Sequence, residues 1–410
     1  MATLDTTALA AVLKTQYTQS KVNNLCYPES AFFAKLKKRT DFVGANKVVA
    51  FQYGSPQGRA FDFATGLTNV NTSLYNKVTV TRAKDYAFGQ VSGEAVEAAG
   101  TDAGALLNAL KKEIDNAFYT ASRSIATQLF RNGGGARGQI SSGSNVGTAT
   151  ITLANINDVV NFEVGMVLNV SATDGTSGSK RTGTVTLTAV NRDTGTLTAS
   201  GNWTAGIAAA AAGDYIFQNG DFESTKQAMM GLAGWIPTTP PTAGDSFFGL
   251  DRSVDPVRLA GLRYTDNAGG QIEETLIKCA ARMAREGASP DMAILNPIDY
   301  GNLVVALGNK VVYDRMKASD APDIGFETVK LMGAKGPINI VSDLNCPSGG
   351  GWMLTSKVWS FETLKGAPRI LNLDGNDMRA AATSDSYIFR IGYYGNLICE
   401  APGWNAYFQL

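Results

Sequence analysis

The longest regular pattern in the chain lies between residues 103 and 131. Apolar residues recur there every three or four positions, which predicts an amphipathic helix with one apolar stripe: Leu107, Leu110, Ile114, Phe118, Ala121, Ile125 and Leu129. Thr101 or Asp102 is suited to cap its N-terminus, and the glycines at 133–135 end it. Such a helix spans roughly 43 Å. It is much longer than the average globular helix, which has about 11 residues.

Two β-prone runs, at residues 47–53 and 75–91, enclose a long and loosely apolar excursion. In the second run, polar and apolar residues alternate from Lys77 to Thr81, which is the period of a half-buried strand. The first run ends in the turn-forming residues 54–58 (GSPQG). The pattern predicts one extended hairpin over residues 47–91. A lone two-stranded hairpin buries little within its own chain, so it needs a neighbour.

Residues 138–220 have a different texture, rich in Gly, Thr, Ser and Ala and poor in cations. Turn signals separate short β-prone segments at 148–153, 164–172, 183–190 and 194–199. The third is the clearest, because threonines alternate with apolar residues along it. The five alanines at 208–212 predict a loop or one helical turn. We expect a small all-β domain inserted into an α+β protein.

The remaining segments mix helices and strands. Residues 1–42 are expected to form an N-terminal arm with one helix at 6–19 and a second that begins near residues 28–30 (PES). Beyond residue 220, helices are predicted at 222–233, 267–287 and 298–307. Strands are predicted at 292–295, 338–342, 352–355, 358–363, 386–391, 396–400 and 404–410. The fold class is therefore α+β.

Composition favours a protein that associates with other subunits. The charged fraction is 18%, below the roughly 25% typical of soluble domains, which leaves more surface to bury. Lys plus Arg and Asp plus Glu both count 36, so the formal net charge is zero. A protein that coats nucleic acid needs a basic excess or a basic tail. The dense basic cluster at residues 35–39 (KLKKR) follows an apolar run, as at the solvated end of an amphipathic helix.

Candidate chemistry is sparse. There is no histidine, which removes His-based triads and most zinc sites. Residues 133–138 (GGGARG) match a G-x-G-x-x-G pattern, but they follow a helix instead of opening one, so we expect a flexible hinge and no dinucleotide site. The cysteines form no C-x-x-C pair, and Cys279 falls on an apolar helical face, where a buried thiol is expected: Cys26, Cys279, Cys346 and Cys399.

Acidic pairs add no site either. Glu273 and Glu274 are adjacent on a predicted helix and point in different directions, and Asp374 and Asp377 lie in a turn-forming sequence. We therefore expect no catalytic residue, no cofactor and no metal, and we expect the protein not to be an enzyme. No signal-peptide pattern opens the sequence and no apolar run reaches transmembrane length, so a cytosolic product without a membrane partner is expected.

The order of these elements resembles the HK97-like major capsid proteins of tailed bacteriophages. Residues 33–39 (FAKLKKR), followed by 42–44 (FVG) and the strand to residue 54, look like the entry to an E-loop, and 290–297 (PDMAILNP) looks like a strand and helix start of the axial domain. The resemblance covers nearly the whole chain outside 138–218. It implies this organisation: N-terminal arm 1–42, E-loop 43–91, spine helix and first part of the peripheral (P) domain 92–137, inserted all-β domain 138–220, axial (A) domain 221–365, and C-terminal P-domain strands 366–410.

The resemblance implies a function by assembly. Subunits would form hexamers and pentamers of an icosahedral shell, assembled in the host cytoplasm, that encloses double-stranded DNA without sequence-specific binding. A scaffolding protein and a portal protein are expected partners, and a decoration protein is left open. The E-loop would lie on a neighbouring subunit, with contacts expected from Tyr53, Pro56, Arg59, Phe61 and Phe63. Some relatives form a covalent crosslink between a lysine and an asparagine of neighbouring subunits. We do not assign that role to the hairpin lysines, which are expected to be solvated: Lys47, Lys77 and Lys84.

Two other functions stay open. An encapsulin-type compartment shares the fold and encloses cargo enzymes instead of DNA. A β-rich adhesion or carbohydrate-binding protein would use residues 138–218 as its binding module.

Overall fold

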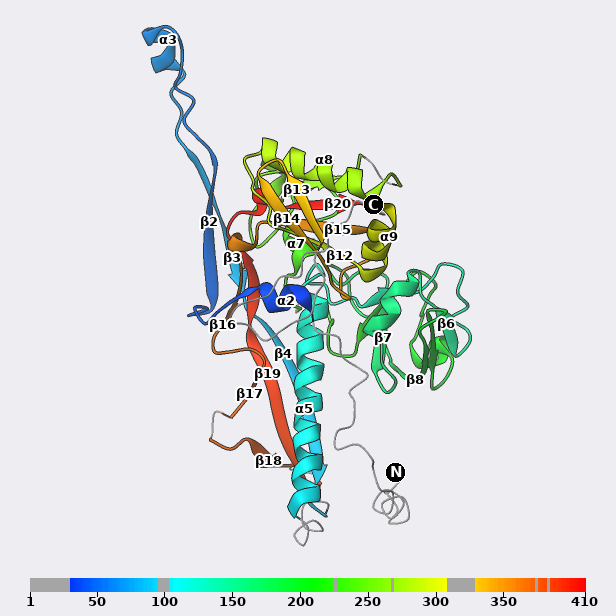
Figure 1. Ribbon diagram of the computed structural model, residues 1–410. Helices are drawn as coiled ribbons and strands as arrows, with labels where there is room; N and C mark the ends of the chain where they lie inside the picture. The colour runs from blue at the N-terminus through cyan, green and yellow to red at the C-terminus, as the bar shows by residue number, and fades with distance from the viewer. Residues whose placement is uncertain are drawn as a thin grey trace.

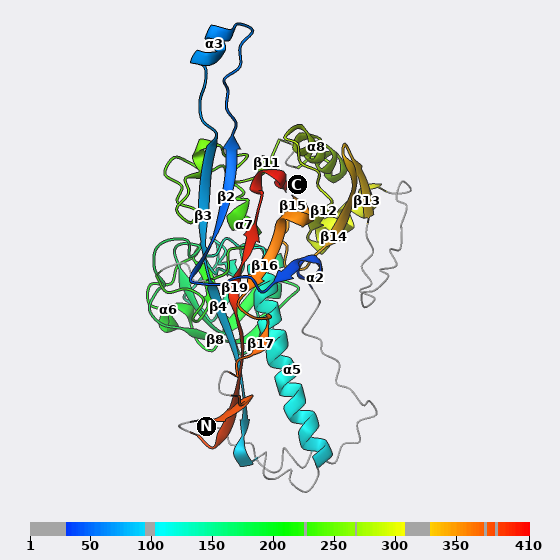
Figure 2. The same ribbon diagram turned by 90° about the vertical axis from the view of Figure 1, so that its left-hand side faces the viewer.

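The computed structural model describes residues 30–94, 103–224, 228–266, 269–307, 329–372, 375–381 and 384–410, with side chains of the long helix described from Glu113 onward. The chain forms a central body with a long hairpin at one end, a helix and strands at the other, and a β-rich unit at its side (Figures 1 and 2). The expected helix at 6–19 and the expected caps Thr101 and Asp102 lie outside the described residues.

The long helix predicted from the apolar stripe is α5 (Ala103–Gln128), which lies along the strands β4 (Ala83–Ser92) and β19 (Ser386–Cys399) (Figure 1). Its Ala117 and Ala121 pack against Phe389 and Ile391 of β19. The strand β19 organises the first sheet, because it pairs antiparallel with four strands: β4, β16 (Trp359–Thr363), β17 (Arg369–Ile370) and β18 (Met378–Ala380).

The hairpin pairs β2 (Asn46–Gly54) with β3 (Leu74–Thr81), and the short helix α3 (Phe63–Thr68) lies at its tip. Its base is anchored in the largest apolar cluster of the body by buried side chains on alternate positions: Val49, Phe51, Val78 and Val80. The remainder of the hairpin extends away from the body (Figure 2). The predicted extended hairpin is therefore present, and its apolar half-buried period holds only at the base.

Residues 138–218 contribute every strand of a second, antiparallel sheet, and we call this unit the β module. The sheet order is β5 (Gly138–Gln139), β10 (Tyr215–Gln218), β7 (Val167–Ser171), β8 (Val185–Asn191), β9 (Thr196–Ala199) and β6 (Thr150–Thr152). It encloses its own apolar cluster, which includes the fully buried Trp203 on the short helix α6 (Trp203–Gly206). The four predicted segments match β6, β7, β8 and β9.

A third sheet has the order β11 (Leu262–Tyr264), β20 (Ala406–Gln409), β15 (Gly350–Leu354), β12 (Met292–Leu295), β14 (Gly336–Ser342) and β13 (Val329–Gly333). Two helices pack on it, α8 (Ile272–Arg285) and α9 (Pro297–Leu307). The buried face of α8 includes Cys279, as predicted. Shorter helices connect the units: α2 (Ala31–Lys35), α7 (Leu232–Trp235) and the 3-10 turns at Ile156–Asn161, Arg252–Val254, Ser356–Val358 and Pro402–Trp404.

The predicted hairpin strand at 75–91 is in fact two strands. β3 pairs with β2, whereas β4 pairs with β19 in a continuous register from Ala83 opposite Gly395 to Ser92 opposite Ser386. The partner of β4 is some three hundred residues away in sequence, so the local alternation gives no sign that the partner changes at Arg82. The hairpin therefore ends at Thr81, ten residues before the end expected from the sequence at residue 91.

The predicted helix at 222–233 is wrong, because only Leu232–Trp235 is helical among its described residues. The backbone amides of Met229 and Met230 donate to the side chains of Gln128 and Asn396. Both methionine side chains are buried in the core. Side chains far away in sequence thus accept the hydrogen bonds of these backbone amides, so the segment need not be helical. Its apolar spacing reflects burial on more than one side.

Two shorter predictions also fail. The basic residues at 35–39 do not form one helix end: α2 stops at Lys35, and β1 (Lys37–Arg39) pairs parallel with β16. The strands expected at 386–391 and 396–400 are one continuous strand, β19. Gly392 lies between the two expected strands, and a Cβ atom there would lie 2.5 Å from the carbonyl oxygen of Asp85. The glycine is needed because β4 passes close by.

The glycines after α5 are packed, not free. A Cβ atom at Gly134 would lie 2.2 Å from the carbonyl oxygen of Asp174, and Gly133 and Gly135 have positive φ. All three are buried where the helix meets the β module. The expectation of a flexible hinge at 133–138 is therefore replaced by a close contact that only glycine permits.

The C-terminal segment divides between two sheets. Strands β17, β18 and β19 belong to the first sheet, while β20 lies between β11 and β15 in the third. Conversely, β16 lies within the expected axial region 221–365 but belongs to the first sheet, where it pairs with β19. The first and third sheets are therefore each completed by strands distant in sequence, which local patterns do not reveal.

Candidate assembly surfaces

The tip of the hairpin carries the most exposed aromatic side chains in the described part of the chain. Phe61 is 98% exposed and Phe63 is 87% exposed, and none of the residues from 54 to 71 is buried. Leu67 and Val70 on the same tip are also exposed. Contiguous exposed apolar surface is a feature of interaction sites in soluble proteins. We call residues 54–71 the hairpin tip.

The hairpin tip has a defined internal structure. Asp62 caps α3, and its carboxylate accepts hydrogen bonds from the backbone amide of Thr65 at 2.9 Å and from the Thr65 hydroxyl at 3.0 Å. These bonds lower the pKa of Asp62, because they favour its charged form. Across the tip, the backbone amide of Gln57 donates to the side chain of Asn71. The tip is thus ordered before it meets any partner.

The five residues expected to contact a neighbour do not share one environment. Pro56, Arg59, Phe61 and Phe63 are exposed on the tip, and the guanidinium of Arg59 lies 4.8 Å from the centre of the Phe61 ring. Tyr53 instead packs partly against the body, and its carbonyl oxygen accepts a hydrogen bond from Arg258. Whether the five form contacts between subunits stays a prediction, and the structure favours the four at the tip.

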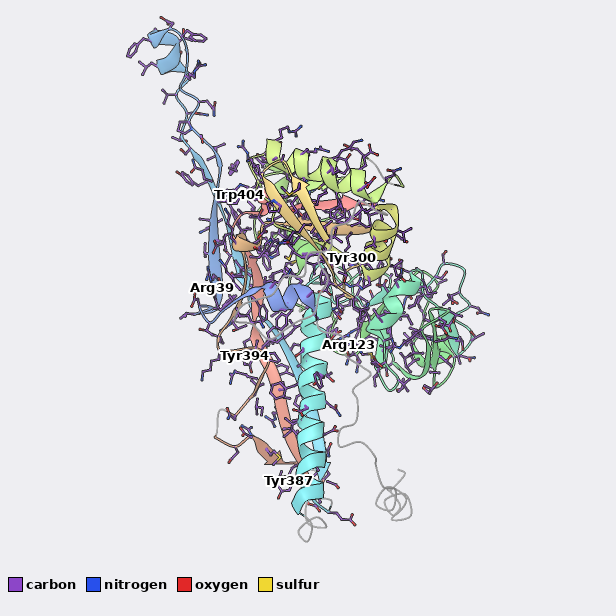
Figure 3. All side chains as sticks on the ribbon, viewed as in Figure 1. Arg39, Arg123, Tyr300, Tyr387, Tyr394 and Trp404 are labelled. Atoms are coloured by element: carbon purple, nitrogen blue, oxygen red, sulfur yellow. The ribbon has the colours of Figure 1, made fainter. Side chains whose placement is uncertain are left out.

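The outward face of β4 and β19 is a second exposed apolar surface. Tyr86, Phe88 and Tyr394 meet on this face, and we call them the aromatic face. Phe88 is 64% exposed, and the hydroxyls of Tyr86 and Tyr394 lie 3.5 Å apart, which with burial raises the pKa of Tyr86 to about 12. The opposite face of the same strands is covered by α5, and Figure 3 shows Tyr394 and Tyr387 along β19. Sequence reasoning missed this face because β4 was assigned to the hairpin.

A groove of about 1040 Å³ separates the edge of β4 from the β module. The three walls come from β4 with Thr81 and Arg82, from the C-terminal half of α5, and from residues 163–167 and 218–221 of the module and its exit. β4 pairs with β19 only, so its other edge has no partner strand among the described residues. Figure 3 shows Arg123 between α5 and the module, where it pairs with Glu163.

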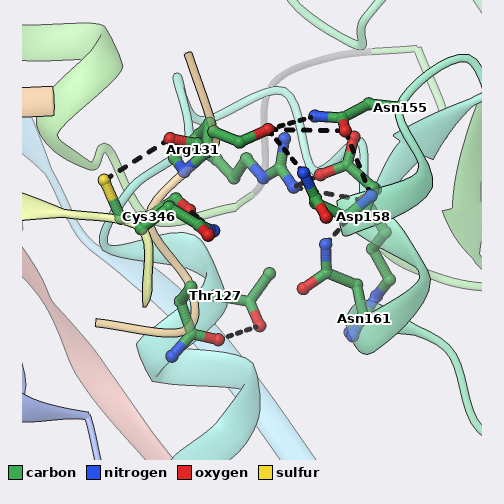
Figure 4. Close-up of polar contacts among 12 residues, drawn as sticks. Thr127, Arg131, Asn155, Asp158, Asn161 and Cys346 are labelled. Carbon is green, nitrogen blue, oxygen red and sulfur yellow. Dashed lines mark hydrogen bonds and ion pairs between the residues drawn. The ribbon is translucent and has the colours of Figure 1, made fainter. Parts of the chain in front are cut away.

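The β module is held against the body by a polar junction near the end of α5 (Figure 4). Arg131 pairs with Asp158 at 2.9 Å and also donates to the carbonyl oxygen of Arg137. The side chains of Asn155 and Asn157 hydrogen-bond Ser348 in the loop before β15. Because these partners come from three parts of the chain, the module has a fixed position relative to the groove.

The described residues give no catalytic constellation. The thiols of Cys279, Cys346 and Cys399 are buried, and burial raises the pKa of each, so they are poor nucleophiles. In the described ranges, no group of three or more acidic or cysteine side chains gathers as metal ligands would. Nor is any helix there long and apolar enough to cross a membrane. Glu274, one of the acidic residues noted in the sequence, pairs with Lys278 on α8.

No protein-family model and no curated protein sequence matches the chain. Solved structures do. The capsid of an empty GTA particle matches with a TM-score of 0.50 at 8% identity, over 98% of this chain and 97% of that one. The cyanophage A-1(L) capsid matches with a TM-score of 0.49 at 14% identity, over 95% and 94%. The holo-SrpI encapsulin complex from Synechococcus elongatus PCC 7942 matches with a TM-score of 0.46 at 9% identity, over 100% and 96%. The first match shows that the chain has a capsid-subunit fold over nearly its whole length.

Proposed function

We propose that this chain, which has the HK97-like capsid fold, is the major capsid protein of a tailed bacteriophage. In this proposal it self-assembles as hexamers and pentamers into an icosahedral shell around double-stranded DNA. The observation that carries the proposal is the hairpin tip: an ordered projection whose aromatic side chains are not covered by any described part of the chain.

Burial of the exposed rings of Phe61 and Phe63 favours association with another molecule. Burial of a phenylalanine side chain contributes roughly 1.5–3 kcal/mol relative to leaving it in water. The hairpin projects away from the described body, which leaves Phe61 and Phe63 available to bury against another molecule. A second copy of this chain offers a matching surface, since its aromatic face is also exposed. Repeated contacts of this head-to-tail kind close into rings when the rotation between subunits permits it.

The remaining units take their roles from this arrangement. The E-loop is the hairpin of β2 and β3, the peripheral domain is α5 with the sheet around β19, and the axial domain is the third sheet with α8 and α9. Residues 1–42 are the N-terminal arm, and the β module is an insertion on the shell surface. A scaffolding protein and a portal protein are the proposed partners during assembly in the host cytoplasm, and the mature site is the virion capsid.

The neutral charge balance fits this role. Basic proteins condense DNA by releasing counterions from its phosphates, and this chain has 36 basic and 36 acidic residues. A shell into which DNA is driven through a portal does not require such an excess.

Electron microscopy of the purified protein, expressed with and without a scaffolding protein, tests the proposal. Closed icosahedral particles built from hexamers and pentamers are expected. Small particles that retain a cargo enzyme would favour the encapsulin-type compartment. A monomer that stays monodisperse under every assembly condition would contradict shell formation.

A further inference from the structure

Threonine is distributed unevenly along the chain, and the fold gathers it on one side of the β module. Three or more threonines at alternate positions occur in only three stretches of the sequence: residues 148–152 (TATIT), 182–188 (TGTVTLT) and 194–198 (TGTLT). These stretches contribute to β6, β8 and β9, which are neighbours in the sheet of the module (Figure 1). Alternate residues of a strand point to the same side of its sheet, so each stretch forms a row.

The pairing of the strands brings the three rows together. Thr150 lies opposite Thr198 and Thr152 lies opposite Thr196, and the hydroxyls of Thr150 and Thr198 are 3.0 Å apart. On the other side of β9, the hydroxyl of Thr188 donates to the carbonyl oxygen of Thr198 at 3.2 Å. The residues that alternate with the threonines are buried in the core of the module: Ile151, Val185, Leu187 and Leu197. We call the outer side, formed by the threonines of residues 148–152, 184–188 and 194–198, the threonine face.

The threonine face is open to solvent and uncharged. Thr196 and Thr198 are half-buried, and the other threonines of the face are exposed. Its three stretches contain no charged and no aromatic residue, and their large apolar residues point into the core. The preference of threonine for strands does not account for this, because the exposed positions of β3 also include Tyr75 and Lys77. The face thus presents hydroxyl and methyl groups together.

This chemistry excludes several classes of partner. Nucleic acid and anionic membrane surfaces require cations, and the face has none. Stable protein interfaces are anchored by aromatic or large apolar side chains, which the face also lacks. Addition of a strand to the outer edge of β6 is blocked, because the amide of Thr152 donates to the hydroxyl of Ser144 and its carbonyl oxygen accepts from the amide of Ser141. A neutral partner that is itself rich in hydroxyl groups fits what is left.

We propose that the threonine face binds a neutral polysaccharide. Threonine hydroxyls hydrogen-bond the hydroxyls of the sugar, and threonine methyl groups contact the C–H groups of its rings. A hydroxyl both donates and accepts hydrogen bonds, so the two surfaces can pair in either sense. The inference goes beyond the proposed function, because it gives the inserted β module a binding role of its own.

A single contact of this kind is weak, because each hydrogen bond to the sugar replaces one to water. Repetition of the face compensates for this. A shell built from many copies presents many modules, and a long polysaccharide engages several of them at once, which raises the overall affinity without any new contact. This gain rests on the proposed function, whereas binding to the isolated chain does not.

Affinity electrophoresis of the full-length chain tests the proposal, with assembled and unassembled protein in native gels that contain dextran, laminarin or mannan. At least one of these neutral polysaccharides is expected to retard the protein, and shells should be retarded more than the unassembled chain. The anionic polysaccharide heparin should cause no retardation. No retardation by any of the three, or equal or stronger retardation by heparin, would overturn the proposal. Failure to form shells would contradict the proposed function, while the unassembled chain still tests the face.

Matched variants test the role of the hydroxyls. Thr150, Thr186 and Thr188 are replaced together by valine, which keeps the methyl groups and the strand preference, and affinity should fall at least about tenfold. Serine at the same positions keeps the hydroxyls and should retain most of the affinity. Thr120→Val is the control, because Thr120 is exposed on α5, outside the face. A valine variant that binds as the wild type does would overturn the proposal. So would one that binds normally but no longer forms shells, because the face would then be an interface between copies.

Thermal unfolding of each variant shows whether its subunit is intact. All three replaced threonines are exposed, so the melting temperatures should stay close to that of the wild type. The electrophoresis of the wild-type chain does not depend on how the variants fold.

Discussion

The hairpin and the β module are both built from antiparallel strands, and they treat their apolar residues in opposite ways. The module buries its large side chains in its own cluster, with Trp203 at the centre. The hairpin buries only its base, and beyond Gly54 its apolar residues are exposed. A region that encloses its apolar surface is complete within one chain, whereas a region that exposes an ordered apolar surface is completed by a partner. The comparison separates the stability of the subunit from its assembly.

The largest expected effect comes from removing the hairpin tip. Deletion of residues 54–71 with an Asn-Gly turn in their place should abolish closed shells. The melting temperature of the subunit should change little, because none of these residues is buried. Sedimentation velocity and thermal unfolding measure the two properties on one sample. Shells at wild-type yield would show that the tip is not required for assembly.

Truncation of one aromatic residue in each region separates the effect on subunit stability from the effect on assembly. Trp203 is fully buried and its indole nitrogen donates to the carbonyl oxygen of Ala149 at 3.0 Å. Trp203→Ala should lower the free energy of unfolding of the β module by roughly 3–5 kcal/mol. Phe61→Ala should change the free energy of unfolding of the subunit by less than about 0.5 kcal/mol. The same substitution should slow assembly. Denaturant titrations of both variants give the stabilities, and light scattering gives the assembly rates. Equal stability losses would remove the distinction between the two regions.

A smaller effect is expected from the order within the tip. Asp62→Ala removes the cap of α3, so the tip samples more conformations before it docks. Assembly should be several-fold slower, with no change in the global melting temperature, and Asp62→Asn should retain most of the rate because asparagine also caps helices. An Ala variant that assembles as fast as the wild type would show that order in the tip is not needed.

The smallest effect concerns Asp85 in a subunit kept monomeric by the tip deletion. Because burial raises the pKa of Asp85 above its value in the unfolded chain, stability falls as the pH rises between the two values and stays lower above them. Asp85→Asn should therefore raise the melting temperature at neutral pH, and the difference should vanish near pH 4, about the ordinary pKa of aspartate. A lower melting temperature at neutral pH would contradict the unfavourable burial of this charge.

Much of the fold was accessible from local patterns. The apolar stripe from Leu107 to Leu129 predicted α5, and β-prone runs separated by turn signals predicted β6, β7, β8 and β9. What failed depends on distant partners. β4 pairs with β19, and Met229 and Met230 take a non-helical path, because of contacts more than one hundred residues away in sequence. The place of β20 in the third sheet is likewise decided by its distant pairing with β11.

The candidate site shows the same division. Arg59, Phe61 and Phe63 were identified because the family resemblance placed them in a hairpin that lies on a neighbouring subunit. The aromatic face and Asp85 were missed, because their exposure depends on which strand pairs with β4 and on where the β module lies. A local signal exists for a surface that projects from the body. None exists for a surface that lies between units.

The most direct test of the central claim is a density map of the assembled particle that resolves the hairpin. Phe61 and Phe63 of each subunit are expected to be buried against a neighbouring copy of the chain. Closed shells in which both rings remain exposed to solvent would contradict it.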